Sequence, residues 1–275
     1  SAAGLADDLG RPWKGPLPAR RIVSLAPNAT EIVCAVGGRS RLIGVDTASD
    51  YPAEVKRVRR VGDFLRPSVE RMVALRPDAI LLSSATVTAD SAAEFESTLR
   101  APVFVLNPSR LEDAARNVRS VGRLLGLEAK AEEVAAGMEE RFAAVAKAVS
   151  GRPRPSVFLE VWHDPLTTAG AGTFLDDLVR LAGGRSIAAA ERKPFPIFSL
   201  EALLAADPDV YVLTTGMVPG PDPARRSGFA SLRAVRAGRV VRVPADPVLR
   251  PTPRLMLGAT LMMDAIHPEV RIHAE

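Results

Sequence analysis

The sequence repeats one short pattern twice. The first copy runs from Ser68 to Leu82 and the second from Ser199 to Leu213. Each copy has a glutamate two residues after its serine and a Pro-Asp pair before an apolar run, and matched positions lie 131 residues apart. The motif Gly-Gly-Arg-Ser also occurs twice, at 37–40 and 183–186. A duplicated helix-then-strand unit predicts two similar lobes, and a cleft between such lobes is where we expect a ligand.

Signals for strands and helices alternate along most of the chain. This alternation favours an α/β fold with two similar lobes, each built on a mainly parallel sheet. From residue 111 to about 150 the pattern is helical almost throughout, and Gly151 and Pro153 end it. The predicted organisation is therefore a loosely held N-terminal arm, an N-terminal α/β lobe, a single long connector helix and a C-terminal α/β lobe, at 1–19, 20–125, 126–151 and 152–275.

Particular residues are expected to begin and end these helices. Asn28 or Thr30 is the predicted N-cap of a helix over 31–36, which Gly37 would end. Ser68 and Ser199 are the predicted N-caps of the two duplicated helices. Glu70 and Glu201 would then lie in the first turns, where the helix dipole favours a carboxylate.

Composition excludes several classes of protein. The 47% hydrophobic and 25% charged residues are ordinary for a globular protein, and no apolar run approaches the roughly 20 residues that cross a bilayer. Lys and Arg number 36 against 32 Asp and Glu and do not cluster, so we expect no nucleic-acid partner. Cys34 is the only cysteine and reads as a buried structural thiol. With three histidines in the chain, we expect no metal site.

Sequence motifs for catalysis are missing. There is no P-loop, no G-x-S-x-G elbow and no complete Rossmann glycine motif. We therefore expect no catalytic residues and no cofactor, and the sequence leans towards ligand binding. An α/β enzyme, such as a nucleotide-dependent transferase, is the more remote alternative.

Aromatic residues make up 5% of the chain, and several fall in loops predicted to follow strands or precede the duplicated helices. Because such loops form the ligand crevice of α/β lobes, they suit a large, flat, partly apolar ligand. The loop aromatics are Tyr51, Phe64, Trp162, Phe195 and Phe198, of which Phe198 is expected to cap the core of its own lobe. His163, next to Trp162, is a candidate to ligate a metal centre or to donate a hydrogen bond to a ligand, or else it is simply solvated.

Several segments taken together resemble the ABC-transporter substrate-binding proteins of the cobalamin, haem and ferric-siderophore group. The resemblance covers about residues 20–266 and is greatest to the vitamin B12-binding members. It rests on the segments 21–31, 49–52, 69–78, 160–170 and 200–201. Phe64 and Phe195 stand where a member of that subgroup carries Trp. The resemblance implies two α/β lobes joined by one long helix, and no catalysis.

The resemblance also implies roles for single residues. Glu70 and Glu201 match the two glutamates that dock on arginines of the permease dimer in the cytoplasmic membrane. The expected ligand-binding residues are Pro27, Asn28, Tyr51, Phe64, Trp162, His163, Phe195 and Arg250.

Three ligands fit the group, and a corrinoid such as cobalamin is preferred. A corrin has apolar faces and a fringe of amides, which suits loop aromatics and Asn28. A ferric siderophore would call on converging arginines, for which Arg66, Arg192 and Arg250 are candidates. Haem would need an axial ligand such as Tyr51 or His163.

The family further implies a monomer outside the cytoplasmic membrane. The chain begins without a basic or apolar leader, so we expect a periplasmic or membrane-associated extracellular protein whose export signal has been removed. A sensor domain that signals to a membrane partner after binding is a third hypothesis.

Overall fold

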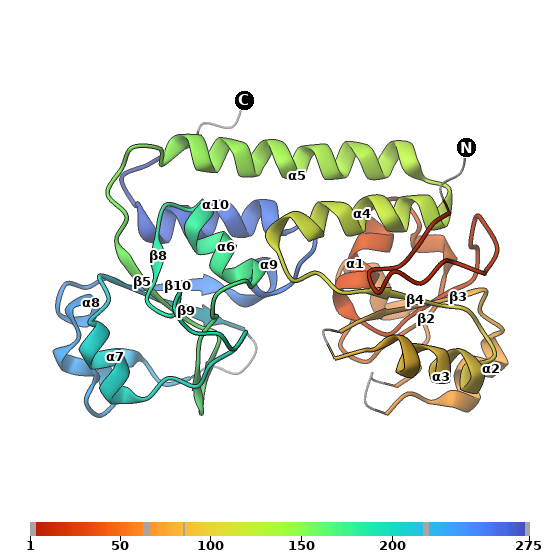
Figure 1. The fold of residues 1–275 in the computed structure, drawn as a ribbon, viewed down its shortest axis with the longest axis horizontal. Coiled ribbons are helices and arrows are strands. Elements are labelled where there is room, and N and C mark those ends of the chain that lie inside the picture. The colour runs from red at the N-terminus through yellow and green to blue at the C-terminus, as the bar shows by residue number, and fades with distance from the viewer. Residues whose placement is uncertain (1–3, 63–65, 85, 217–219, 273–275) are drawn as a thin grey trace. The chain divides into compact units, whose positions relative to one another are not determined.

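The computed structural model describes residues 4–62, 66–84, 86–216 and 220–272. The chain divides into two compact units, with the division between Met138 and Glu139. Figure 1 shows that each unit contains its own sheet with helices packed on it. The expected α/β fold is confirmed. No helix in the described ranges has the length and apolar composition to cross a membrane.

Unit 1 is built on a four-stranded sheet in the order β2-β1-β3-β4, with every neighbouring pair parallel. Its strands are β1 (Ile22–Ser24), β2 (Leu42–Val45), β3 (Ala79–Ser83) and β4 (Val103–Leu106). Its helices are α1 (Pro27–Ala35), α2 (Val69–Leu75), α3 (Ala89–Leu99) and α4 (Leu111–Leu125), with short 3-10 helices at Arg39–Arg41 and Ala53–Arg57.

Unit 2 has the corresponding parallel sheet, in the order β8-β5-β9-β10, and an added antiparallel hairpin, β6-β7. Its strands are β5 (Ser156–Glu160), β6 (Trp162–His163), β7 (Leu166–Thr167), β8 (Arg185–Ser186), β9 (Val210–Thr215) and β10 (Val240–Pro244). Its helices are α6 (Phe174–Leu181), α7 (Leu200–Ala206), α8 (Arg233–Arg236), α9 (Ala245–Leu249) and α10 (Leu255–Ile266), with 3-10 helices at Pro223–Arg225 and Phe229–Ser231.

The duplicated sequence folds into duplicated structure. Helices α2 and α7 have the same length and the same 131-residue offset as the sequence repeat, and β3 and β9 start at matched positions. Each helix ends on a left-handed residue, Arg76 at φ 46° and Asp207 at φ 39°. The aspartate of each copy then anchors the start of the neighbouring strand: Asp78 accepts the backbone N–H of Arg21 at 2.8 Å, and Asp209 accepts that of Ser156 at 2.8 Å.

One predicted helix start is wrong, and one predicted N-cap lacks its side-chain bond. Helix α1 begins at Pro27 because proline, with its fixed φ and missing N–H, is suited to the first helical position, so Asn28 and Thr30 lie inside the helix. Ser199 caps α7 as predicted, accepting the N–H of Ala202 at 3.1 Å. Ser68 precedes α2, but its ψ of 88° is not that of an extended N-cap and its side chain accepts no capping bond.

The N-terminal arm is not loosely held over its described part. Leu5 and Asp7 are buried, and the ring of Trp13 packs edge-on against Phe104 at 5.8 Å. Asp8 accepts the N–H of Asn107 at 2.7 Å, which ties the arm to the residue after β4. The arm is therefore part of unit 1.

The predicted helical stretch from 111 onward consists of two helices. Gly126, in the left-handed conformation at φ 61°, ends α4, and α5 (Glu128–Ala148) follows and crosses the division between the units. The ion pair from Arg119 to Glu132, at 2.8 Å, links α4 to the first half of α5.

Cys34, on α1, is half-buried, and burial raises the pKa of its thiol to about 11. The sequence predicted a buried structural thiol, and the side chain is only partly enclosed.

Candidate functional site

The candidate residues follow strands of the two parallel sheets. Pro27 and Asn28 come after β1, Tyr51 after β2, Trp162 after β5 and Arg250 after β10. Parallel strands end at the same edge of a sheet, so within each unit these residues lie at the carboxyl edge. Each unit's edge is described below by itself.

The carboxyl edge of unit 2 carries an exposed apolar surface, which we call the aromatic shelf and define as Trp162, Phe195 and Ile197. These side chains are 36%, 49% and 68% exposed. The segment 194–198 is held along the β6-β7 hairpin by backbone bonds, among them Phe198 N–H to Leu166 O at 2.8 Å and Gly170 N–H to Pro194 O at 2.9 Å. The shelf is therefore a backbone-braced platform with apolar side chains facing solvent.

A polar bond fixes the indole of Trp162. Its Nε1 donates to the backbone oxygen of Asp164 at 2.8 Å, across the tip of the hairpin. The ring of His163 lies 5.9 Å from the indole ring, between centroids. Phe195 lies in a loop as predicted, whereas Trp162 lies in strand β6. Phe198 packs on Phe158 at 5.6 Å, against the core of unit 2, as expected.

Beneath the shelf lies a buried ionic cluster formed by Glu160, Arg226 and Tyr211. Arg226 donates to both carboxylate oxygens of Glu160, at 2.6 and 2.9 Å, and the Tyr211 hydroxyl donates to the same carboxylate. The side chains of Glu160 and Arg226 are 2% and 9% exposed. Burial and the neighbouring Glu160 raise the pKa of Tyr211, so this hydroxyl stays protonated. The cluster fixes the end of β5, two residues before Trp162.

His163 is held in place by a close backbone approach. A Cβ added at Gly220 would lie 2.8 Å from the Cβ of His163 and 2.9 Å from Nη2 of Arg226. Glycine at 220 therefore lets its loop fit between the hairpin and the buried cluster.

A pocket of about 600 Å³ lies beside the shelf. It is lined by Ala190, Glu191, Arg192, Lys193, Phe195, Pro196 and Ile197. Two cations and one anion sit on this wall, all exposed, so it can accept a ligand with both apolar and anionic parts. Arg250 is half-buried and forms an ion pair with Asp246 at 3.2 Å, which offsets much of its charge.

The carboxyl edge of unit 1 is more polar. Asn28 is 8% exposed and donates through Nδ2 to the hydroxyl of Ser83 at 2.7 Å, so β1 and β3 are linked where they end. The buried hydroxyl of Thr30 bonds to Ser24 at 2.8 Å and to Ser49 at 2.7 Å. This network orders the loops after β1 and β2.

The segment between β2 and α2 contains Asp46 and the remaining unit 1 residues that are predicted to bind ligand. Burial raises the pKa of Asp46, whose carboxylate accepts the Ser49 hydroxyl. Tyr51 is 46% exposed, and Arg66 is exposed. Phe64 lies outside the described residues.

The two repeat glutamates are both exposed. Glu70 is the second residue of α2 and Glu201 the second residue of α7. Because these helices connect parallel strands, their first turns face the carboxyl side of their own sheets. The carboxylate of each glutamate is therefore exposed and can contact a partner protein that binds its unit.

Over residues 22–247 the chain matches the family model described as periplasmic binding protein. The chain belongs to this family. An uncharacterized ABC transporter substrate-binding lipoprotein of Bacillus subtilis, YvrC, is 31% identical over 256 residues, which cover 91% of this chain and 81% of the relative. The family assignment makes the protein the substrate-binding component of an ABC importer, with a permease as its partner, and not an enzyme.

Solved structures agree with this assignment. The periplasmic vitamin B12-binding protein BtuF of Vibrio cholerae superposes with a TM-score of 0.81 at 26% identity, covering 91% of this chain and 98% of that one. The periplasmic heme-binding protein BhuT, in complex with two hemes, has a TM-score of 0.76 at 27% identity and covers 90% and 98%.

Sequence reasoning missed several residues that shape the edge of unit 2 in this periplasmic binding protein. The pairing of Glu160 with Arg226 spans 66 residues and leaves no local signal. Ile197 was not identified as part of an exposed surface, although it is 68% exposed. Among the described residues no group of three or more His, Cys, Asp or Glu side chains is placed to hold a metal ion.

Proposed function

We propose that this periplasmic binding protein captures cobalamin or a related corrinoid outside the cytoplasmic membrane and delivers it, as a monomer, to the permease dimer of its importer. The observation that carries the proposal is the aromatic shelf. Three exposed apolar side chains on a braced backbone suit the broad apolar face of a corrin. The likeness to the BtuF structure supports the same ligand class.

The neighbouring polar groups suit the rim of such a ligand. His163 lies beside the shelf residues Trp162 and Phe195. The other residues that we assign to ligand binding are Pro27, Asn28, Tyr51, Phe64 and Arg250. A corrin is fringed with amides, which accept hydrogen bonds from imidazole and guanidinium groups.

Haem is the second candidate, and one observation favours it. Tyr51 is 46% exposed at the carboxyl edge of unit 1, and tyrosine is one of the residue types that hold haem iron. A ferric siderophore would instead depend on Arg66, Arg192 and Arg250, and the charge of Arg250 is already partly offset by Asp246.

Calorimetry of the purified protein against cyanocobalamin, haemin and a panel of ferric siderophores tests the ligand. We expect cyanocobalamin to bind most tightly, and Trp162→Ala and Phe195→Ala each to weaken it by about tenfold or more. Leu17→Ala is the matched control, since Leu17 is 56% exposed but precedes β1 at the opposite edge of its sheet. If haemin binds more tightly than cyanocobalamin and the Tyr51→Phe variant loses that binding, haem rather than cobalamin is the ligand.

Docking on the permease is assigned to Glu70 and Glu201, one in each unit. A carboxylate pairs well with an arginine of a partner, and two such pairs would fix the orientation of the bound protein. We expect the double variant E70A/E201A to bind ligand normally and to lose transport by at least about tenfold in reconstituted importer. The control E94A/E140A removes two other exposed glutamates. Unchanged transport in E70A/E201A would exclude this docking role.

A further inference from the structure

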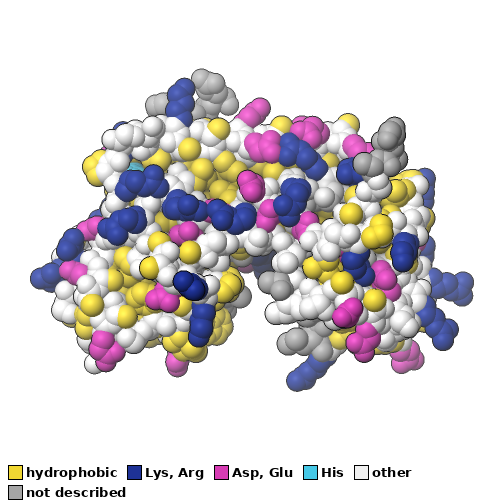
Figure 2. Space-filling model, in the orientation of Figure 1, with side chains coloured by type: hydrophobic (Ala, Val, Ile, Leu, Met, Phe, Trp, Pro, Cys, Tyr) yellow, Lys and Arg dark blue, Asp and Glu magenta, His cyan; other side chains and the backbone are white. Residues whose placement is uncertain are grey.

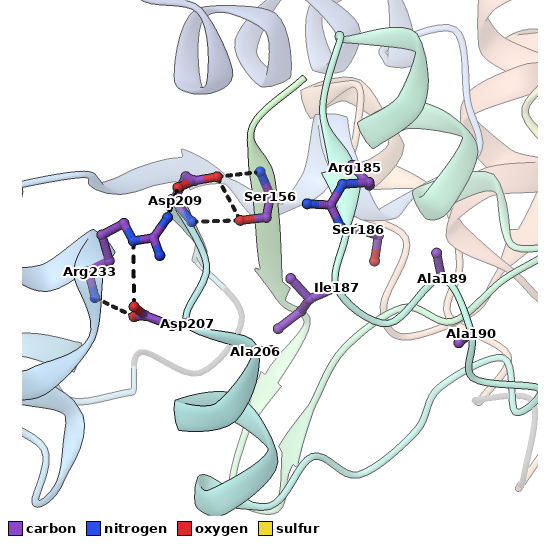
Figure 3. Close-up of a pocket in the computed structure, with 10 residues that line it drawn as sticks. All are labelled: Ser156, Arg185, Ser186, Ile187, Ala189, Ala190, Ala206, Asp207, Asp209 and Arg233. Atoms are coloured by element: carbon purple, nitrogen blue, oxygen red, sulfur yellow. Dashed lines mark hydrogen bonds and ion pairs between the residues drawn. The ribbon is translucent and has the colours of Figure 1, made fainter. Parts of the chain in front are cut away.

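A separate pocket, of about 460 Å³, lies at the other edge of the unit 2 sheet (Figure 3). Ser156 and Arg185 are the first residues of β5 and β8, and Asp209 directly precedes β9. In a parallel sheet these residues mark the amino edge, whereas Trp162 follows the carboxyl end of β5. The pocket therefore lies at the edge opposite Trp162, although it shares Ala190 with the pocket beside the shelf. We call it the amino-edge pocket and define it as Ser156, Arg185, Ser186, Ile187, Ala189, Ala190, Ala206, Asp207, Asp209 and Arg233.

The carboxylates of this pocket are already occupied by internal donors. Asp209 accepts the N–H and the hydroxyl of Ser156 at 2.8 and 2.7 Å and a guanidinium N–H of Arg233 at 2.7 Å. The Ser156 bonds and Arg233 lower the pKa of Asp209, which therefore stays charged. Asp207 accepts the backbone N–H of Arg233 at 2.6 Å. These acceptors have little left to offer a ligand.

One hydrogen-bond donor group of the pocket, by contrast, is not paired in this way. Among the residues that the structure describes, the guanidinium of Arg185 makes no hydrogen bond or ion pair, and the residue is exposed. Figure 3 shows this guanidinium pointing towards Ser156, with Arg233 on the other side of β5. A guanidinium offers five N–H donors, in a geometry that fits a carboxylate or a phosphate.

The duplicated fold provides an internal comparison. The strand registers place Ser156 and Arg185 of unit 2 at the positions of Arg21 and Arg41 in unit 1, whereas the Gly-Gly-Arg-Ser motif matches Arg185 to Arg39. There, Arg21 donates to the backbone oxygens of Arg76 and Leu75 at 3.1 and 2.6 Å.

The second arginine of unit 1 is also used internally. Arg41 donates to the backbone oxygen of Ala19 at 2.9 Å and to that of Leu125. Both arginines of unit 1 thus bind their own backbone. In unit 2 the short side chain of Ser156 replaces one of them, and the other, Arg185, has no acceptor within the described part of the chain.

We propose that the amino-edge pocket binds a small organic anion, with a carboxylate or phosphate group on Arg185. The body of the ligand would lie against the apolar side chains of Ile187, Ala189 and Ala206. A volume of about 460 Å³ is in the range of small-molecule sites. We infer an anion because the Arg185 guanidinium can donate to a ligand, whereas the carboxylates of Asp207 and Asp209 already accept bonds from Arg233.

Titration of the full chain with acetate, succinate, inorganic phosphate and methyl phosphate, at constant ionic strength, tests the proposal. Binding is followed by the amide resonances of Ser156, Ser186 and Ile187 in ¹H–¹⁵N spectra. We expect saturable shifts with at least one probe, and the preferred probe assigns the head group as carboxylate or phosphate. Arg185→Ala should weaken binding by about tenfold or more.

The matched control is Arg236→Ala, which removes another exposed arginine of unit 2 that does not line the pocket. It should change the affinity by less than about twofold, because only general screening is altered. Ala206→Leu, at the end of α7, should block the pocket without changing charge. The proposal is overturned if no probe saturates below about 10 mM, if R185A binds no more weakly than R236A, or if A206L binds like the wild type.

Discussion

At the scale of single residues, the ion pair of Glu160 and Arg226 is the most demanding arrangement in unit 2. Both side chains are almost completely buried, and each satisfies the other through two hydrogen bonds. Removing one charge leaves the other in a medium of low dielectric with no partner, which costs more than the pair contributes.

We therefore expect Glu160→Gln and Arg226→Met each to lower the free energy of unfolding by roughly 3–5 kcal/mol. The double variant should lose clearly less than the sum, because no unpaired charge remains buried. Urea denaturation followed by circular dichroism gives the three values. Strictly additive losses would show that the two side chains do not depend on each other.

The lowered pKa of Asp209 predicts that the stability of the folded protein depends on pH. Its pKa in the folded protein is lowered from 3.8, first by the backbone N–H of Ser156, so its stabilising effect is present above pH 3.8 and is lost as the pH falls through the folded pKa. Asp209→Asn should therefore lower stability at pH 7, and the difference from the wild type should shrink below pH 3.8. Urea midpoints at pH 7 and pH 2.5 measure this, and a difference independent of pH would contradict it.

The positions of single residues in the fold were predictable where the sequence signal was local. Loop aromatics such as Trp162 and Phe195 were found because few aromatics exist and strands were easy to locate. The capping role of Ser68 was not, since backbone dihedrals outside the helix decide whether a serine hydroxyl reaches the first turn. The ionic cluster joins residues far apart in the chain and has no sequence signature.

At the scale of elements, the duplicated Gly-Gly motif ends a helix in each unit. Gly37 and Gly183 have φ values of 88° and 83°, and the N–H of the next glycine bonds back to Val33 or Val179. The surroundings differ, however. A Cβ at Gly37 would meet nothing within 4 Å, whereas a Cβ at Gly183 would lie 2.7 Å from Nε2 of His267 and 2.9 Å from Cβ of Val149.

This pair is a matched test of backbone strain against packing. Gly37→Ala should cost about 1–2 kcal/mol, the penalty of a left-handed alanine. Gly183→Ala should cost at least about 1 kcal/mol more, because a neighbouring segment must also move. Urea denaturation measures the free energy of unfolding of both variants. Equal decreases would mean that His267 and Val149 move aside at no energetic cost.

One element boundary was predicted well because glycine marks it. The end of α1 just before Gly37 follows from the sequence, whereas the end of α4 at Gly126 does not, because the pattern is helical almost throughout from 111 to about 150. The start of α1 was missed because Pro27 was interpreted as ending a strand, although proline equally begins a helix. The attachment of the arm depends on Asp7 and Asp8 meeting backbone groups about 100 residues away, which no local pattern reveals.

At the scale of the whole molecule, the internal repeat was the most informative signal. An offset that is constant over helix, turn and strand implies two copies of one fold, and both sheets have the same strand order. What the repeat could not show is divergence between the copies. The added hairpin has no counterpart among the described strands of unit 1, and the amino-edge pocket includes positions where the two copies carry different residues, such as Ser156 in place of Arg21. Figure 2 shows basic side chains lying among acidic ones on the face it draws, as the dispersed charges predicted.

Ligand binding should also stabilise the whole chain. A ligand that binds only the folded state at 100 times its Kd raises the free energy of unfolding by about 2.7 kcal/mol. We expect cyanocobalamin to raise the melting temperature in a concentration-dependent way, and W162A to require correspondingly more ligand. Differential scanning calorimetry measures the melting temperature. If the melting temperature does not change with cyanocobalamin concentration, cyanocobalamin is not the ligand.

The single thiol has a practical consequence. With a pKa of about 11, Cys34 is ionised in roughly one molecule in ten thousand at pH 7. Maleimide reagents attack the thiolate, so the native protein would be almost inert to brief labelling. A cysteine introduced on the hairpin next to Trp162 could therefore carry a fluorophore selectively, which would turn the molecule into an optical sensor for its cargo.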